Sequence, residues 1–277
     1  AETGIITVVK AFADAPAAKA GVKNGDIIYK VKGKEVTGVD INNVVTEMKG
    51  EKGTTVDITV YRESEKKYID FTITRDQVNE PTVEYKMLDK KKKIGYIQIS
   101  QFEEVTYDQF TKALDDLKKQ GMKAVIFDVR SNPGGLYETV CKMLDEILPE
   151  GNLVLTKDKY GNEEKQTSDS KCLEMPMVVL QNKDSASASE IFAGAIQDFN
   201  AGKIVGTQSF GKGIVQTILP LSDGSAVKLT VQDYYTPSGK NIHGKGITPD
   251  VEAELEENAT SDTQLEKAKE TIMELMK

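Results

Sequence analysis

Apolar positions in the first 76 residues follow mainly the two-residue period of β-strands. Residues 5–9 form a β-branched apolar run, and polar and apolar residues alternate over 55–62 and over 68–75, as half-buried strands require. A short helix is expected over 41–49, ended by a glycine. The pattern predicts a small module of α+β type.

The second part of the chain alternates buried strands with amphipathic helices. Residues 124–129 and 178–180 are continuous apolar runs, typical of strands that are buried on both faces. Apolar side chains recur at helical spacing over 106–119, and further helices are predicted over 135–148 and 187–199. This alternation predicts a layered α/β core.

Two β-rich segments interrupt the core, and a helix closes the chain. Residues 152–166 and 214–235 read as hairpins that turn at 160–162 and 222–224. The helix predicted over 262–276 carries one apolar face. That face can dock onto the core or pack against a second subunit of a homodimer.

These patterns divide the chain into four segments. The predicted segments are an α+β module over 1–76, a linker over 77–92, the α/β core with its two hairpins over 93–257, and a C-terminal helix over 258–277. A lysine run lies at the end of the predicted linker, and we interpret it as a solvated turn in preference to a binding patch.

Composition narrows the chemistry of the chain. It has 277 residues, a formal net charge of −8, no tryptophan and one histidine, His243. A three-histidine zinc site, a paired-histidine protease motif and a cysteine-rich zinc ribbon are therefore excluded. We expect no metal and no cofactor, and a histidine-based hydrolase would depend on His243 alone.

The charged residues also limit the possible partners. The acidic balance and the presence of only three arginines, Arg62, Arg75 and Arg130, argue against nucleic acid. No apolar run of about 18 residues is present, so no membrane span is expected, and no signal peptide is visible. Cys141 and Cys172 can form one bridge or remain two thiols, and the usual burial of free cysteine favours the thiols.

Three serines alternate with alanines where the helix over 187–199 begins. A hydroxyl on a strand-to-helix turn lies beside free helix N–H groups, which stabilise developing negative charge. Serine is also a common N-cap, and taken alone the motif favours capping. One cap needs only one of Ser185, Ser187 and Ser189.

A lysine between two glycines, Lys212, is the candidate base. Glycine neighbours let another chain segment approach closely. Desolvation disfavours the charged form of lysine, so a buried Lys212 beside a serine could act as a general base. Gln216 could orient its amine. By itself, the motif reads as a lysine in a turn.

Paired glycines, Gly134 and Gly135, follow the buried strand over 124–129. Their backbone N–H groups could form an oxyanion hole or an anion-binding nest. A phosphate-binding loop fits poorly, because Gly-Lys-Ser/Thr and the six-position glycine fingerprint are both missing.

Four sequence motifs occur in a fixed order: RSNPGG at 130–135, SASASE at 185–190, FGKGIVQ at 210–216 and YTPSGK at 235–240. In this order they resemble the C-terminal processing proteases, which are PDZ-containing serine peptidases with a Ser–Lys dyad. The resemblance spans nearly the whole chain, and a family-like GKGITPD follows at 244–250. It implies a crotonase/ClpP-like protease core, with residues 1–76 as a PDZ domain.

The resemblance assigns roles to residues of these motifs. It makes Ser185 and Ser189 supporting residues, with Ser189 as a plausible cap. The implied catalytic set is Ser187 as nucleophile, Lys212 as base and Gln216 as its orienting partner, with the backbone N–H groups of Ala188 and of Gly134 or Gly135 as oxyanion donors.

The chain departs from the family pattern at three places. Asp184 stands where the family has glycine, and we interpret it as a solvated loop charge. His243 matches no catalytic position. The first strand and the carboxylate-binding loop of the PDZ domain are expected to be missing before residue 1, which would leave its peptide groove incomplete.

The resemblance implies an endopeptidase that cleaves proteins near free, apolar C-termini through an acyl-enzyme. The PDZ domain would bind the substrate tail and gate the active site. The family acts outside the cytoplasm, so a bacterial cell envelope or secreted location is expected. A ligand-binding module and an acidic scaffold are the alternatives, and the intact pair Ser187 and Lys212 favours the enzyme.

Overall fold

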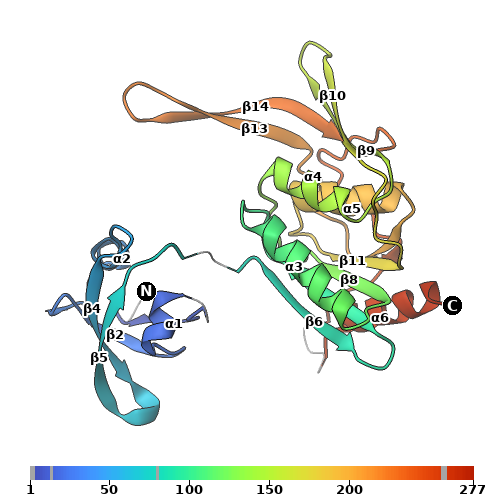
Figure 1. Ribbon diagram of the computed structural model, residues 1–277. Helices are drawn as coiled ribbons and strands as arrows, with labels where there is room; N and C mark the ends of the chain where they lie inside the picture. The colour runs from blue at the N-terminus through green and yellow to red at the C-terminus, as the bar shows by residue number, and fades with distance from the viewer. Residues whose placement is uncertain (1–3, 13–14, 79–80, 257–260) are drawn as a thin grey trace. The chain divides into compact units, whose positions relative to one another are not determined.

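The computed structural model describes residues 4–12, 15–78, 81–256 and 261–277 (Figure 1). Contacts between residues separate the chain into two compact units, which divide between Pro81 and Thr82.

Unit 1 is built on an antiparallel sheet of five strands in the order β1-β2-β4-β5, with β3 paired to β2. The apolar positions of β4 and Val44 of α2 form its core, which confirms the strands predicted from alternation. The elements are β1 (Ile6–Thr7), α1 (Pro16–Ala20), β2 (Ile27–Val31), β3 (Lys34–Glu35), α2 (Ile41–Met48), β4 (Thr55–Arg62), a 3₁₀ turn (Glu63–Glu65) and β5 (Lys67–Thr74).

A buried ion pair connects the segment between α1 and β2 with the end of β4. The Arg62 guanidinium donates to both carboxylate oxygens of Asp26 at 2.7 and 2.8 Å and to the Gly21 carbonyl at 2.8 Å. The hydrogen bond from Arg62 outweighs burial and lowers the pKa of Asp26. The pair therefore stays charged at neutral pH and holds two distant chain segments together.

The main sheet of unit 2 has six strands in the order β15-β12-β11-β8-β7-β6. All neighbours are parallel except β6, which runs antiparallel to β7 along one edge. The strands are β6 (Val83–Asp89), β7 (Ile94–Ile99), β8 (Ala124–Asp128), β11 (Met177–Gln181), β12 (Gly202–Gly206) and β15 (Val251–Glu252).

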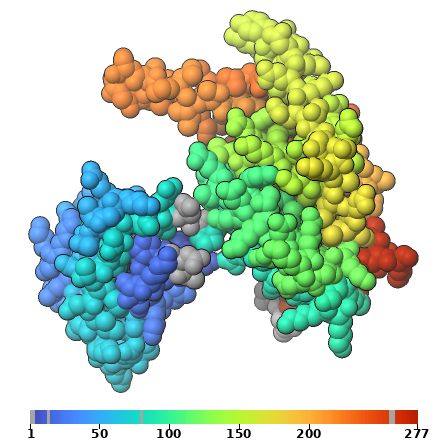
Figure 2. Space-filling view, viewed as in Figure 1, coloured from blue at the N-terminus to red at the C-terminus, as the bar shows by residue number. Residues whose placement is uncertain are grey.

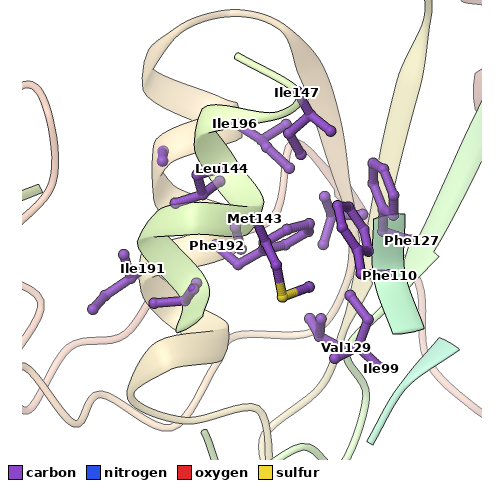
Figure 3. Close-up of a cluster of buried hydrophobic side chains, with 14 of the residues drawn as sticks. Ile99, Phe110, Phe127, Val129, Met143, Leu144, Ile147, Ile191, Phe192 and Ile196 are labelled. Atoms are coloured by element: carbon purple, nitrogen blue, oxygen red, sulfur yellow. The ribbon is translucent and has the colours of Figure 1, made fainter. Parts of the chain in front are cut away.

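Helices cover both faces of this sheet, which explains its continuous apolar runs. Phe127 faces the cluster formed with α3 (Thr106–Lys119), α4 (Tyr137–Asp145) and α5 (Ala188–Asp198), part of which is drawn in Figure 3. Its neighbour Ile126 faces α6 (Thr263–Leu275) on the other side. Successive strand residues are thus buried against different helices.

The two predicted hairpins are confirmed, and they join into one antiparallel sheet of order β10-β9-β14-β13. The β13–β14 hairpin projects from the body of its unit, orange in Figure 2, and most of its side chains are exposed. The strands are β9 (Gly151–Asp158), β10 (Glu163–Ser168), β13 (Ile214–Pro220) and β14 (Ala226–Tyr235).

The predicted linker over 77–92 is wrong over most of its length. Residues 83–89 form β6, whose polar and apolar side chains alternate because it is a half-exposed edge strand. The lysine run lies in the turn between β6 and β7. The expected boundary at 257/258 lies outside the described residues, and β12 was not anticipated.

The apolar face of α6 packs on its own sheet. Ala268 and Ile272 are fully buried with Val178 and Leu180 of β11. This confirms docking onto the core as the function of that face. Within the described segments, no helix has the length and apolar character needed to cross a membrane.

Both cysteines are free thiols, as burial favoured. Cys141 lies on the buried face of α4 in the core, whereas Cys172 is partly exposed. Burial raises the pKa of the Cys141 thiol to about 12, and a protonated thiol is a poor nucleophile.

We therefore expect one thiol to react with a disulfide reagent at pH 8 in the folded protein and two after denaturation. The thiol that does not react in the folded protein should be Cys141, because it is buried and protonated. The Cys172→Ser variant retains only Cys141, so thiol titration of this variant measures the reactivity of Cys141 alone. Rapid reaction of Cys141 in the folded Cys172→Ser variant would contradict this burial.

Candidate active site

One pocket of unit 2 brings together the residues that the sequence singled out. Gly135, Ser187, Ala188, Lys212 and Gln216 all line it. Gly134 lies directly behind, since a Cβ placed on it would come within 2.8 Å of the Ser187 Cβ. The pocket lies beyond the carboxyl ends of β8 and β11, where ligand sites of parallel sheets are usually found.

Ser187 occupies the turn between β11 and α5 in a strained conformation. Its φ is +57° and its ψ is −116°, a combination that costs about 1–3 kcal/mol and persists only where surrounding contacts enforce it. Ser187 is the N-cap of α5, so the expectation that Ser189 is the cap is wrong: Ser189 lies inside the first turn of the helix. The same kind of sharp strand-to-helix turn presents the nucleophile in α/β hydrolases.

The hydrogen bonds of the three serines distinguish the middle one. The Ser185 hydroxyl donates to the Val129 carbonyl at 2.8 Å, and the Ser189 hydroxyl donates to the Asn132 carbonyl at 2.9 Å. Both therefore tie the turn to the segment that follows β8. Among the described residues, the Ser187 hydroxyl donates no hydrogen bond; it faces the Glu190 N–H in a capping box. Of the three serines, only Ser187 lines the pocket.

The glycines beside Lys212 are required by a close backbone approach. A Cβ on Gly211 would lie 2.9 Å from the Lys245 nitrogen, and one on Gly213 would lie 2.7 Å from the His243 nitrogen. Gly211 also has a φ of +90°, which favours glycine. The segment that follows Lys240 thus packs against the backbone of both glycines that flank Lys212.

The Lys212 amine and the Ser187 hydroxyl share the pocket without a direct hydrogen bond between them in the described structure. The expected contact from Gln216 to Lys212 is not seen either. The Gln216 amide donates instead to the Thr230 hydroxyl across the hairpin, at 3.4 Å. An orienting role for Gln216 therefore remains a prediction.

Two backbone N–H groups beside Ser187 make no hydrogen bond within the described residues, those of Ala188 and Gly135. Gly134 differs, because its N–H donates to Asn132 Oδ1 at 2.8 Å. Gly135 forms a parallel bridge with Phe102. The hydrogen bonds of this bridge run from the Phe102 N–H to the Gly134 carbonyl and from the Leu136 N–H to the Phe102 carbonyl. This bridge leaves the Gly135 N–H unused.

Glu190 ends the SASASE motif, and the sequence alone assigns it no role. Its side chain is fully buried, and its two oxygens accept four hydrogen bonds. One oxygen accepts from the N–H groups of Ser187 and Lys212 at 2.9 and 2.8 Å. The other accepts from the Ser209 hydroxyl and the Gly211 N–H at 2.6 and 2.7 Å. The Ser-x-x-Glu spacing of a capping box was the available signal.

Tyr234 is the second residue that the sequence analysis missed. Its hydroxyl lies 3.0 Å from the Ser187 carbonyl oxygen and 2.6 Å from that of Lys212, with the phenol as donor. Burial, together with the nearby Glu190 carboxylate, raises the pKa of Tyr234 well above its usual value. The phenol therefore keeps the proton that it donates.

The remaining charged side chains of the motifs lie away from the reacting groups. The Arg130 guanidinium binds Asp128 and Asp262 at 2.6 and 2.7 Å and so fastens the start of α6. Burial alone would lower the pKa of Arg130, but these carboxylates outweigh it and raise the pKa. Asp184 and His243 are exposed, and neither lines the pocket.

Comparison with known proteins assigns both units. Residues 93–253 match the model of peptidase family S41, and residues 1–73 match that of the PDZ domain. A carboxy-terminal-processing protease of Bartonella bacilliformis is 41% identical over 91% of this chain. The chain spans 59% of that protein. Two probable CtpA-like serine proteases, of Staphylococcus epidermidis and Staphylococcus aureus, are each 40% identical to this chain over 89% of it, and the chain spans about half of their length.

Solved structures agree with this assignment. A photosystem II D1 C-terminal processing protease is 31% identical, with a TM-score of 0.59 over 97% of this chain and 72% of its own. The tricorn protease, at 20% identity and a TM-score of 0.52 over 99% of this chain and 28% of its own, shares the fold. The chain thus belongs to peptidase family S41, a family of serine proteases, and carries a PDZ domain at its N-terminal end.

Proposed function

We propose that the protein is a serine endopeptidase that cleaves protein substrates near their C-termini with Ser187 and Lys212. The observation that carries this proposal is the pocket that holds Lys212 together with Ser187. Unlike the hydroxyls of Ser185 and Ser189, the Ser187 hydroxyl donates no hydrogen bond in the described structure. Membership of the family supports the reaction class. The names of the relatives support cleavage near the C-terminus.

The reaction proceeds through an acyl-enzyme. Neutral Lys212 takes the proton of the Ser187 hydroxyl, and Oγ attacks the scissile carbonyl carbon. The resulting tetrahedral intermediate collapses as Lys212 returns the proton to the leaving amine, which breaks the C–N bond. Lys212 then removes a proton from water, which attacks the ester carbonyl carbon. The second tetrahedral intermediate collapses as Lys212 returns that proton to Ser187 Oγ, which breaks the C–O bond and releases the new C-terminus.

The oxyanion of each tetrahedral intermediate is bound by the N–H groups of Ala188 and Gly135. Both are unused donors beside Ser187, whereas the N–H of Gly134 is already committed to Asn132. Unused, fixed donors stabilise developing charge without reorganising. Gln216 orients the Lys212 amine in this scheme after leaving its 3.4 Å contact with Thr230.

The PDZ domain binds the C-terminal tail of the substrate and thereby gates cleavage. Unit 1 exposes four large aliphatic side chains on two short segments, Ile5 and Val9 beside β1 and Ile41 and Val45 on α2. The Gly38 N–H donates to the Gly4 carbonyl at 2.8 Å, which joins these two segments. An apolar tail added beside β1 would contact them.

Three finer features complete the proposal. The core is of the crotonase/ClpP-like type, and the protein acts outside the cytoplasm, in the cell envelope or secreted; both rest on the family resemblance. We propose no homodimer through α6, because its apolar face is covered by its own sheet.

Replacing either member of the dyad should abolish cleavage. We expect Ser187→Ala and Lys212→Ala each to lower kcat/KM by about 10³-fold or more, measured on an unstructured protein with an apolar C-terminus. Lys123→Ala is the control, because Lys123 is exposed and lies at the opposite end of β8. Undiminished cleavage by Ser187→Ala or Lys212→Ala would overturn the assignment.

Activity should rise with pH through the neutral and alkaline range. A base must be unprotonated to accept the serine proton, and higher pH favours the unprotonated form of an amine base. His243→Ala should leave the pH profile of kcat/KM unchanged, because His243 does not line the pocket. A profile that changes with His243→Ala would contradict a lysine base.

Tail recognition should depend on an aliphatic contact of α2. We expect Val45→Glu to raise KM about tenfold, the equivalent of about 1.4 kcal/mol of lost binding, with little change in kcat. Asn43→Glu adds the same charge to an exposed position of the same helix and should leave KM unchanged. Equal KM values for Val45→Glu and the unaltered protein would exclude α2 from the tail-binding site.

A further inference from the structure

Two buried side chains connect the backbone at Ser187 with the backbone at Lys212. Glu190 Oε2 accepts the N–H groups of both residues, at 2.9 and 2.8 Å. The Tyr234 hydroxyl lies within 3.0 and 2.6 Å of both carbonyl oxygens. We propose that Glu190 and Tyr234 are positioning residues that together set the distance between the nucleophile and its base. This inference rests on the proposed Ser187–Lys212 mechanism.

The pair matters because Ser187 and Lys212 lie on different segments of unit 2. Ser187 begins α5, and Lys212 lies in the segment that leads from β12 to β13. In the described structure, no backbone hydrogen bond and no side-chain hydrogen bond runs between the two residues. The N–H and the C=O of each residue are instead shared with the same two side chains.

Burial makes these contacts firm. Glu190 is fully buried and Tyr234 is 1% exposed, so water does not compete for their hydrogen bonds. The other oxygen of Glu190 is held by Ser209 and Gly211. With four donors on two oxygens, the carboxylate has one fixed orientation, and that orientation determines where the two amides lie.

The same contacts hold the strained backbone of Ser187. Its φ of +57° is unusual for serine, and a strained residue needs surroundings that over-determine it. Glu190 holds the N–H of Ser187, and Tyr234 holds its C=O. The same two side chains thus enforce the strained turn at Ser187 and fix its distance from Lys212.

Two substitutions remove these contacts with little change of shape. Glu190→Gln replaces one acceptor oxygen by an NH₂ group that faces N–H donors, and Tyr234→Phe removes only the hydroxyl. We expect kcat to fall about 10²-fold for Glu190→Gln and about tenfold for Tyr234→Phe, because misplacement by about 1 Å costs about 10²-fold. KM should change less than about twofold, since the tail contacts lie elsewhere.

A fluorophosphonate probe, which reacts with activated serines, gives a second readout that needs no peptide substrate. Its rate of labelling Ser187 should fall in the same order in the two variants. Tyr85→Phe is the matched control. It removes a hydroxyl that donates to Asp116 at 2.7 Å, and neither of these two residues lines the pocket. It should change neither kcat nor the labelling rate.

The outcomes separate this inference from the proposed function. If Ser187→Ala is inactive while Glu190→Gln and Tyr234→Phe keep the original kcat and labelling rate, the positioning role is wrong and the dyad stands. If Ser187→Ala cleaves normally, the dyad itself fails.

Hydrogen exchange supplies a test where Glu190→Gln folds poorly. The Ser187 amide donates to Glu190 and the carbonyls of Ser187 and Lys212 accept from Tyr234, so Tyr234→Phe should loosen both segments. We expect the amides of residues 187 and 212 to exchange about tenfold faster in Tyr234→Phe than in Tyr85→Phe. Equal exchange rates would overturn the proposal.

Discussion

The arrangement of the pocket depends on one buried carboxylate. Glu190 accepts four hydrogen bonds and reaches the backbone of both Ser187 and Lys212. A buried charge is costly unless it is fully hydrogen-bonded, so these four donors must be in place when the protein folds. The requirement that stabilises Glu190 therefore also assembles the segments around the pocket.

The layered sheet supplies the rigid support for this contact. Helices pack on both faces of β8 and β11, and the segments that follow these two strands carry Gly135 and Ser187. Ser185 and Ser189 bind the segment after β8 through its carbonyl groups. A nucleophile and unused backbone donors thus lie on neighbouring, firmly held turns, as preorganised catalysis requires.

The sequence was sufficient for much of the fold, because the periods of its apolar residues are clear. The α/β alternation, both hairpins and the helices of unit 2 follow from patterns that depend on local geometry alone. β6 was missed because an edge strand beside a lysine run has the composition of a loop. The joining of the hairpins into one sheet depends on contacts between distant segments, which no local pattern contains.

The sequence by itself determined the candidate groups of the site. Its motifs offered the three serines of 185–189, Lys212 and the paired glycines, its family resemblance singled out Ser187, and its single histidine excluded common alternatives. The tertiary structure decided which of these groups are free to act. In the described part of the chain, the Ser185 and Ser189 hydroxyls and the Gly134 N–H donate hydrogen bonds, whereas the Ser187 hydroxyl and the Gly135 N–H donate none. It also revealed Glu190 and Tyr234 as shared partners. A hydrogen bond needs two groups in place, and the fold brings them together from positions far apart in the chain.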